Sequence, residues 1–134
     1  MNARRLLHPS LLLAALLPLT PAALWAEGAV RVLACDSTRV CDTVGECRSD
    51  SGSLTLRMAP EALDADGSGR YALTLDGDVL PMQAVSEAGP FLWQQADNHY
   101  TLLVNSNTDF VLHALTLSPQ PSASLRYLRC TFRQ

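Results

Sequence analysis

The sequence predicts an all-β domain of about eight antiparallel strands, arranged as a small up-and-down barrel or a meander sandwich and stapled by disulfides. Three observations predict this fold class. Apolar residues alternate with polar ones at a period of two, turn-forming residues separate the runs at hairpin spacing, and four cysteines lie beyond the first 26 residues. No later segment is long enough for a substantial helix, although Ala59 to Leu63 could form one helical turn.

The strand pattern recurs along the chain, in the runs 54–58, 71–75, 91–93, 100–104, 110–117 and 124–132. Between two of these runs, Asp76-Gly77 gives the strongest hairpin signal, because a type I′ turn needs positive φ at both central positions. Pro81 lacks a backbone N–H and therefore predicts that the run around Val79 is short or lies at an edge.

Length and composition allow one globular domain. The chain has 134 residues, of which 48% are hydrophobic and 17% charged, and this balance excludes a disordered protein. All ten basic residues are arginines, and thirteen acidic residues bring the net charge to −3. The basic surface of a nucleic-acid-binding protein is therefore missing, and we expect no nucleic-acid partner.

Residues 1–26 have the pattern of a secretory signal peptide, and residues 27–134 form the single all-β domain. Arg4 and Arg5 precede an apolar run from Leu11 to Leu24, and Ala26 is a small residue suited to cleavage. The run is too short for a comfortable membrane span, so an uncleaved anchor is the weaker alternative. Lipidation of Cys35 in Val32-Leu33-Ala34-Cys35 is a second alternative, although Glu27 and Arg31 separate that box from the apolar run. We expect a periplasmic or secreted protein with no transmembrane segment in the mature chain.

The four cysteines are expected to form two disulfides in an oxidising compartment. Three pairings are possible, and the sequence alone does not decide among them. The turn-like residues 42–46 favour Cys41–Cys47, which leaves Cys35–Cys130 to join the first strand to the last. A metal site on Cys35, Cys41 and Cys47 is the alternative, but the even five-residue spacing does not match a zinc knuckle.

Two short segments resemble sites with known chemistry. Residues 64–69 begin like a calcium-binding loop, with Asp64, Asp66 and Gly69 at suitable positions, but Leu75 stands where the bidentate glutamate is needed. Ser51 lies among small residues outside any nucleophile elbow, and the mature chain has only two histidines, His99 and His113. We therefore expect no metal, no cofactor and no enzymatic activity.

Large aromatic residues gather at Phe91, Trp93 and Tyr100. Aromatic residues favour strands and dominate small cores, so a core position is the first interpretation. A binding patch at the mouth of a barrel is the second.

Three early cysteines after an exported leader, followed by the late Tyr127-Leu128-Arg129-Cys130, resemble a group of small exported cysteine-containing proteins of alphaproteobacteria. This resemblance spans most of the mature chain. It implies an exported location and no particular activity.

A shorter stretch resembles the bacterial inhibitors of C-type lysozyme, which are small eight-stranded periplasmic barrels. Leu80-Pro81 is followed by Ser86-Glu87-Ala88-Gly89, then by Phe91 and Trp93, and finally by Cys130. The resemblance implies that Ser86, Glu87, Ala88, Gly89 and Trp93 form a partner-binding surface whose loop enters the lysozyme cleft. The lysine of that family's second motif has no counterpart, because this chain contains no lysine.

These observations favour a non-enzymatic binding module of the periplasm or cell surface, with an unknown protein or small ligand as its partner. A lysozyme inhibitor is the sharpest form of this hypothesis. The alternatives are a structural envelope protein without a ligand pocket and a small hydrolase.

Overall fold

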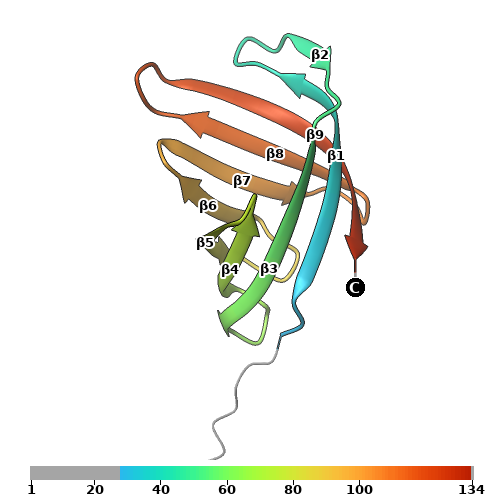
Figure 1. Cartoon of the computed structure of the whole chain (residues 1–134), viewed down its shortest axis with the longest axis vertical. Coiled ribbons are helices and arrows are strands. Elements are labelled where there is room, and N and C mark those ends of the chain that lie inside the picture. Colours follow the sequence, from blue (N-terminus) through green and yellow to red (C-terminus); the bar gives the residue numbers. More distant parts are fainter. Residues whose placement is uncertain (1–27, 134) are drawn as a thin grey trace, which may run out of the picture.

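Residues 28–133, which are those that the computed structural model describes, contain nine strands and no helix (Figure 1). The strands are β1 (Arg31–Cys41), β2 (Cys47–Ser49), β3 (Ser53–Leu63), β4 (Gly69–Leu75), β5 (Asp78–Ala84), β6 (Phe91–Gln95), β7 (Asn98–Val104), β8 (Asp109–Thr116) and β9 (Ser122–Arg133). The expected signal peptide and its cleavage point lie outside the described residues. Within residues 28–133, no apolar helix is long enough to cross a membrane.

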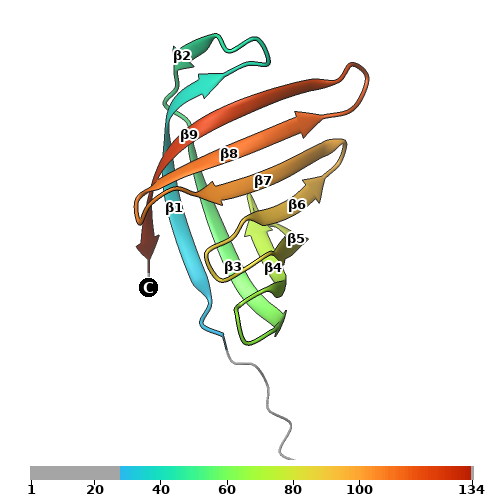
Figure 2. The same cartoon turned by 180° about the vertical axis from the view of Figure 1, so that it is seen from behind.

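Eight of the strands form a closed antiparallel barrel. Each strand from β3 to β9 pairs with the next one in sequence, β1 pairs with β3, and β9 returns to pair with β1. Figures 1 and 2 show β7 and β8 crossing β3 at a steep angle, whereas β9 bends so that its last part runs beside β1. Of the two architectures that the sequence left open, the barrel is correct.

The short strand β2 extends the barrel at one end. It pairs with the end of β1 in the register Arg39↔Ser49, whereas β3 pairs with β1 only up to Asp36↔Ser53. The chain therefore follows the same edge of β1 twice, with an interruption at residues 50–52. Opposite this interruption, the pairing of β1 with β9 shifts register between Ser37 and Arg39.

The barrel interior is filled by alternate side chains of every long strand, as the period of two predicts. The largest completely buried side chains are Tyr71, Leu33, Leu56, Leu73, Leu102 and Cys130. Tyr71 on β4 and Phe91 on β6 meet edge to face inside the barrel, with ring centroids 6.1 Å apart. The middle of the barrel is therefore a packed core.

The hairpin predicted at Asp76-Gly77 is present between β4 and β5. Both residues have positive φ, 51° and 92°, and the register Leu75↔Asp78 closes a two-residue turn. A type I′ turn matches the right-handed twist of the flanking strands. Pro81 lies where β5 pairs with β4 but not with β6. One side of the seven-residue strand β5 is therefore an unpaired edge at this position, as the missing N–H of proline predicted.

The helical turn that Ala59 to Leu63 could have formed is not present, because β3 continues as a strand through Leu63. Its pairing with β4 shifts register between Pro60 and Ala62. The extra residue in this bulge interrupts the alternation of inward and outward side chains, which is the signal by which a strand is recognised.

Both expected disulfides, Cys35–Cys130 and Cys41–Cys47, are present. Cys35 and Cys130 lie directly opposite each other in the β1–β9 pairing, which has nine Cα pairs. We call this pairing the seam, because it joins the first long strand to the last and closes the barrel. The seam disulfide links residues 95 apart, whereas Cys41–Cys47 closes a loop over a separation of six.

Replacing both seam cysteines by alanine should lower the free energy of unfolding by about 4.7 kcal/mol, because a loop of this length loses much chain entropy when it is cross-linked. The matched replacement of Cys41 and Cys47 should cost only about 2.4 kcal/mol. Urea denaturation of both variants measures the difference. Equal losses, or a larger loss from Cys41 and Cys47, would contradict the importance of the seam.

Candidate functional site

One end of the barrel contains an open apolar cavity. This end carries the start of β1, the end of β9, and the β3–β4, β5–β6 and β7–β8 loops (Figure 1). The cavity has a volume of about 270 Å³. We call it the cup, and its lining residues are Arg31, Leu33, Met58, Glu87, Ala88, Phe91, Val104, Ser106, Asn107, Phe110 and Phe132.

The walls of the cup change from buried to exposed toward the solvent. Leu33 and Met58 are almost completely buried and form the side that continues into the core. Phe132 and Val104 lie at the entrance, where they are 56% and 38% exposed. The rings of Phe110 and Phe132 meet edge to face at 6.4 Å. Large apolar side chains left in contact with water at a concave site indicate a binding site rather than a finished core.

Residues 85–90 form the connection between β5 and β6, which we call the cover loop because Glu87 and Ala88 line the cup. The Ser86 hydroxyl donates to the Gly89 carbonyl at 2.6 Å, and the Gly89 N–H donates back to the Ser86 carbonyl at 3.0 Å. Gly89 has a φ of 83°, a conformation that favours glycine. These contacts hold the loop in a tight turn.

The cover loop is also tied to the neighbouring β3–β4 turn. The Glu87 N–H donates to the Asp66 carbonyl at 3.0 Å. Gly67 faces the same residue so closely that a Cβ there would lie 2.6 Å from the Glu87 Cβ. Only glycine fits this approach, so the two loops pack as one unit.

The residues likened to a calcium loop build that β3–β4 turn. The Ser68 hydroxyl and N–H both donate to Asp66 Oδ1, at 2.7 and 3.0 Å. The hydroxyl bond is the main reason why the pKa of Asp66 lies below its ordinary value. These are the hydrogen bonds of an Asx turn, and they explain the Asp and Gly content of the segment.

Arg31 joins the first residue of β1 to the cover loop. Its Nη2 donates to Glu87 Oε1 at 2.7 Å, and its Nη1 donates to the Glu87 carbonyl at 3.0 Å. The Arg31 side chain is 30% exposed and the Glu87 side chain 73% exposed. The pair thus spans the rim of the cup, with the arginine on the inner side.

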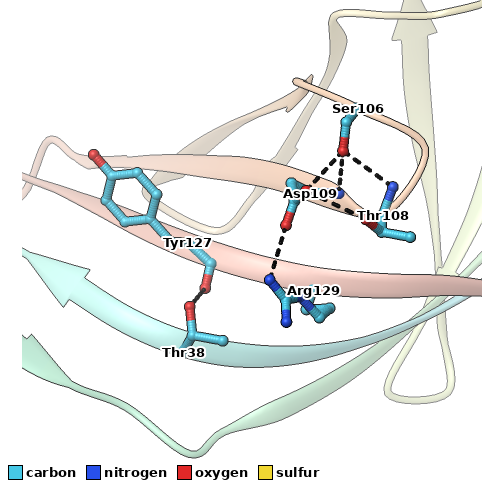
Figure 3. Close-up of polar contacts among 6 residues, drawn as sticks. All are labelled: Thr38, Ser106, Thr108, Asp109, Tyr127 and Arg129. Atoms are coloured by element: carbon cyan, nitrogen blue, oxygen red, sulfur yellow. Dashed lines mark hydrogen bonds and ion pairs between the residues drawn. The ribbon is translucent and has the colours of Figure 1, made fainter.

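The β7–β8 loop supplies the opposite wall and is stabilised by Asp109 (Figure 3). Ser106 Oγ accepts the N–H groups of Thr108 and Asp109 and donates to Asp109 Oδ2 at 2.8 Å. The Thr108 hydroxyl also donates to Oδ2, and Arg129 Nη2 lies 3.5 Å from Oδ1. The Ser106 bond is the largest cause of the lowered pKa of Asp109, with smaller contributions from Thr108 and Arg129.

The outer side of the same region is fixed by contacts between β1 and β9. The Thr38 hydroxyl donates to the Tyr127 carbonyl at 3.2 Å (Figure 3). The guanidinium carbon of Arg39 lies 4.2 Å from the centre of the Tyr127 ring, a cation–π distance. Both contacts fall at the register shift and hold the irregular part of the seam.

The residues predicted as a partner-binding surface are not all together. Ser86, Glu87, Ala88 and Gly89 form the cover loop, but Trp93 is only 5% exposed and lies inside the barrel. It stacks on Tyr100 at a centroid distance of 5.2 Å. Trp93 is therefore part of the core, which was the first interpretation of the aromatic cluster.

The residues considered for a hydrolase do not form a triad. Ser51 lies in the exposed connection from β2 to β3, and His113 faces outward on β8. Within residues 28–133, no hydrogen bond joins the Ser51 hydroxyl to His113.

Several residues of the cup were not identified from the sequence. The alternation in residues 54–58 predicts that Met58 shares a face with Leu54 and Leu56, but not that it borders an open cavity. Phe110 and Phe132 lie in runs that are apolar on both faces in places, so the sequence did not assign them to one face. The role of Arg31 could not be recognised from the sequence, because its ion-pair partner Glu87 is 56 residues away.

No family model matches the chain, and no curated protein or solved structure is significantly similar to it. The proposals below therefore rest on the geometry of the cup.

Acid should destabilise this end of the barrel through Asp66 and Asp109. Both carboxyl groups have a pKa below the unfolded value of about 3.9. The ionised groups therefore stabilise the folded state above that pH, and this stabilisation is lost as the pH falls through their folded pKa. In urea titrations from pH 5 to pH 2.5, the denaturation midpoint should fall less steeply for the variant Asp66→Asn with Asp109→Asn. Asp97→Asn, in a turn at the other end, is the control. An unchanged pH dependence in the double variant would contradict this account.

Proposed function

We propose that residues 27–134 form an exported, non-enzymatic binding domain that takes one apolar chain of a small ligand into the cup. The observation that carries this proposal is an open cavity with mainly apolar walls at the end of a barrel whose middle is packed. Export is supported by the two disulfides, which persist in oxidising compartments.

The volume of the cup suits a narrow ligand. Pockets for drug-sized molecules occupy about 300–1,000 Å³, and a dry apolar cavity of about 150 Å³ binds benzene. At about 270 Å³, the cup lies between these limits. The cup therefore suits one narrow alkyl chain of several methylene groups.

The cover loop does not favour insertion into a lysozyme cleft. An inhibitor would need Ser86 to Gly89 to project from the barrel, and its serine to be available to the partner. Here the Ser86 hydroxyl donates within the loop, and the Glu87 N–H donates to the neighbouring turn. This geometry supports a loop that forms the wall of a ligand site. The cup likewise counts against a structural envelope protein without a pocket.

Binding of straight-chain alcohols of increasing length tests the proposal by calorimetry. Burial of a methylene group contributes about 0.8 kcal/mol, so each added carbon should tighten binding about fourfold. The gain should level off at the length at which the chain outgrows the cup.

The variant Val104→Glu should weaken binding of decanol by on the order of tenfold or more, because it places a charge at the entrance of an apolar site. Leu103→Glu is the matched control: it is the preceding residue of β7, it is 41% exposed against 38% for Val104, and it faces outward. Absence of alcohol binding by the intact domain, or an equal effect of the two variants, would remove the proposal.

A further inference from the structure

We propose that the ligand of the cup is a single-chain amphiphile with an anionic head group, a carboxylate or a phosphate, which Arg31 binds in exchange for the carboxylate of Glu87. This inference rests on the proposed function and deepens it by naming the ligand class.

The charged side chains at the rim of the cup are confined to one site, the Arg31–Glu87 pair. Among the described residues that line the cup, Arg31 is the one cation and Glu87 the one anion. The remaining polar lining residues, Ser106 and Asn107, lie across the entrance on the β7–β8 loop. A chain that fills the apolar interior therefore leaves its polar end beside the guanidinium of Arg31.

Arg31 keeps hydrogen-bonding capacity for such a group. A guanidinium has five N–H donors, and the contacts to Glu87 use two of them. A carboxylate or phosphate matches the planar fork of an arginine and binds it with two parallel hydrogen bonds. The uncharged backbone contact from Nη1 to the Glu87 carbonyl can remain during the exchange and keep the guanidinium oriented.

The Glu87 carboxylate is suited to be displaced. Its side chain is 73% exposed, and ion pairs in contact with water contribute little to stability. An anionic head at the same guanidinium would be held in addition by its apolar chain, whereas Glu87 is held only by its loop. The exchange therefore costs little and frees the carboxylate to point into water.

Because the domain carries a net negative charge, a preference for anionic ligands would indicate a local cation at the binding site. Eight arginines and thirteen acidic residues lie in residues 27–134, which gives a net charge of −5 with neutral histidines. The field of the whole domain disfavours anions, so a preference for them must come from a local cation. The volume of the cup suits one alkyl chain, so the proposal takes a single-chain amphiphile as the ligand.

Calorimetry with four ten-carbon probes tests the inference: decanoate, decyl phosphate, decanol and decylamine, all below the concentrations at which they form micelles. Decanoate or decyl phosphate should bind about tenfold tighter than decanol, as expected for a charge-assisted contact. Decylamine should bind no tighter than decanol. The two anionic probes distinguish a carboxylate ligand from a phosphate ligand.

Three variants assign the preference to the rim. Arg31→Gln should abolish the tenfold preference, so that each anion binds no tighter than decanol does to the same variant. Glu87→Gln should tighten binding of the anions severalfold relative to that of decanol, because it removes the competing carboxylate. Arg57→Gln is the control, since it removes one arginine charge from the exposed outer face of the adjacent β3.

The outcomes separate the two proposals. If no probe binds, the proposed function fails. If decanol binds as tightly as both anions, or if Arg31→Gln keeps the preference, the cup takes apolar chains but the head-group inference is wrong. An equal gain for decanol in Glu87→Gln would also overturn it, because that result would mean that the cover loop had opened.

Discussion

The structure depends on the seam between β1 and β9. Strands β3 to β9 pair with their neighbours in sequence, so local hairpins could form most of the sheet, but only the seam joins its two distant edges. The Cys35–Cys130 disulfide lies within the seam and offsets the chain entropy that closure of so long a loop costs. Without closure, the inward faces of all eight strands would meet water on one side. A domain of about a hundred residues has little spare core with which to compensate.

The seam also positions the cup. Leu33 lies opposite Phe132, two residues from the Cys35–Cys130 pair in each strand. The register of the seam therefore places a buried leucine and an exposed phenylalanine at the cup. Loops on either side of this wall are held by polar contacts, Ser86 to Gly89 in one and Ser106 to Asp109 in the other. The cup is therefore built by rigid strands and tied loops, and a ligand would lose little binding energy to ordering them.

The sequence predicted the features that depend on local chemistry or simple spacing. Asp76-Gly77 specified its turn through the φ values it allows, and the turn-like residues 42–46 pointed to the Cys41–Cys47 bond that is present. The strand pattern could not be recognised where a bulge interrupts the alternation, as after Pro60, or where the strand has only three residues, as in β2. The cup could not be predicted, because a strand pattern indicates which side chains can face inward but not whether the space beyond them is filled. Whether that space is filled depends on how the two edges of the sheet pair and on the positions of distant loops such as residues 85–90.

The central claim is that an apolar chain occupies the space between the cover loop and the β7–β8 loop. Intermolecular nuclear Overhauser effects between bound decanol and the isotope-labelled domain test it most directly. We expect contacts from the alkyl protons to the Met58 and Val104 methyl groups and to the rings of Phe110 and Phe132. Contacts to the outward-facing Leu92 and Leu103 instead, or to Leu75 and Leu80 at the opposite end, would contradict it.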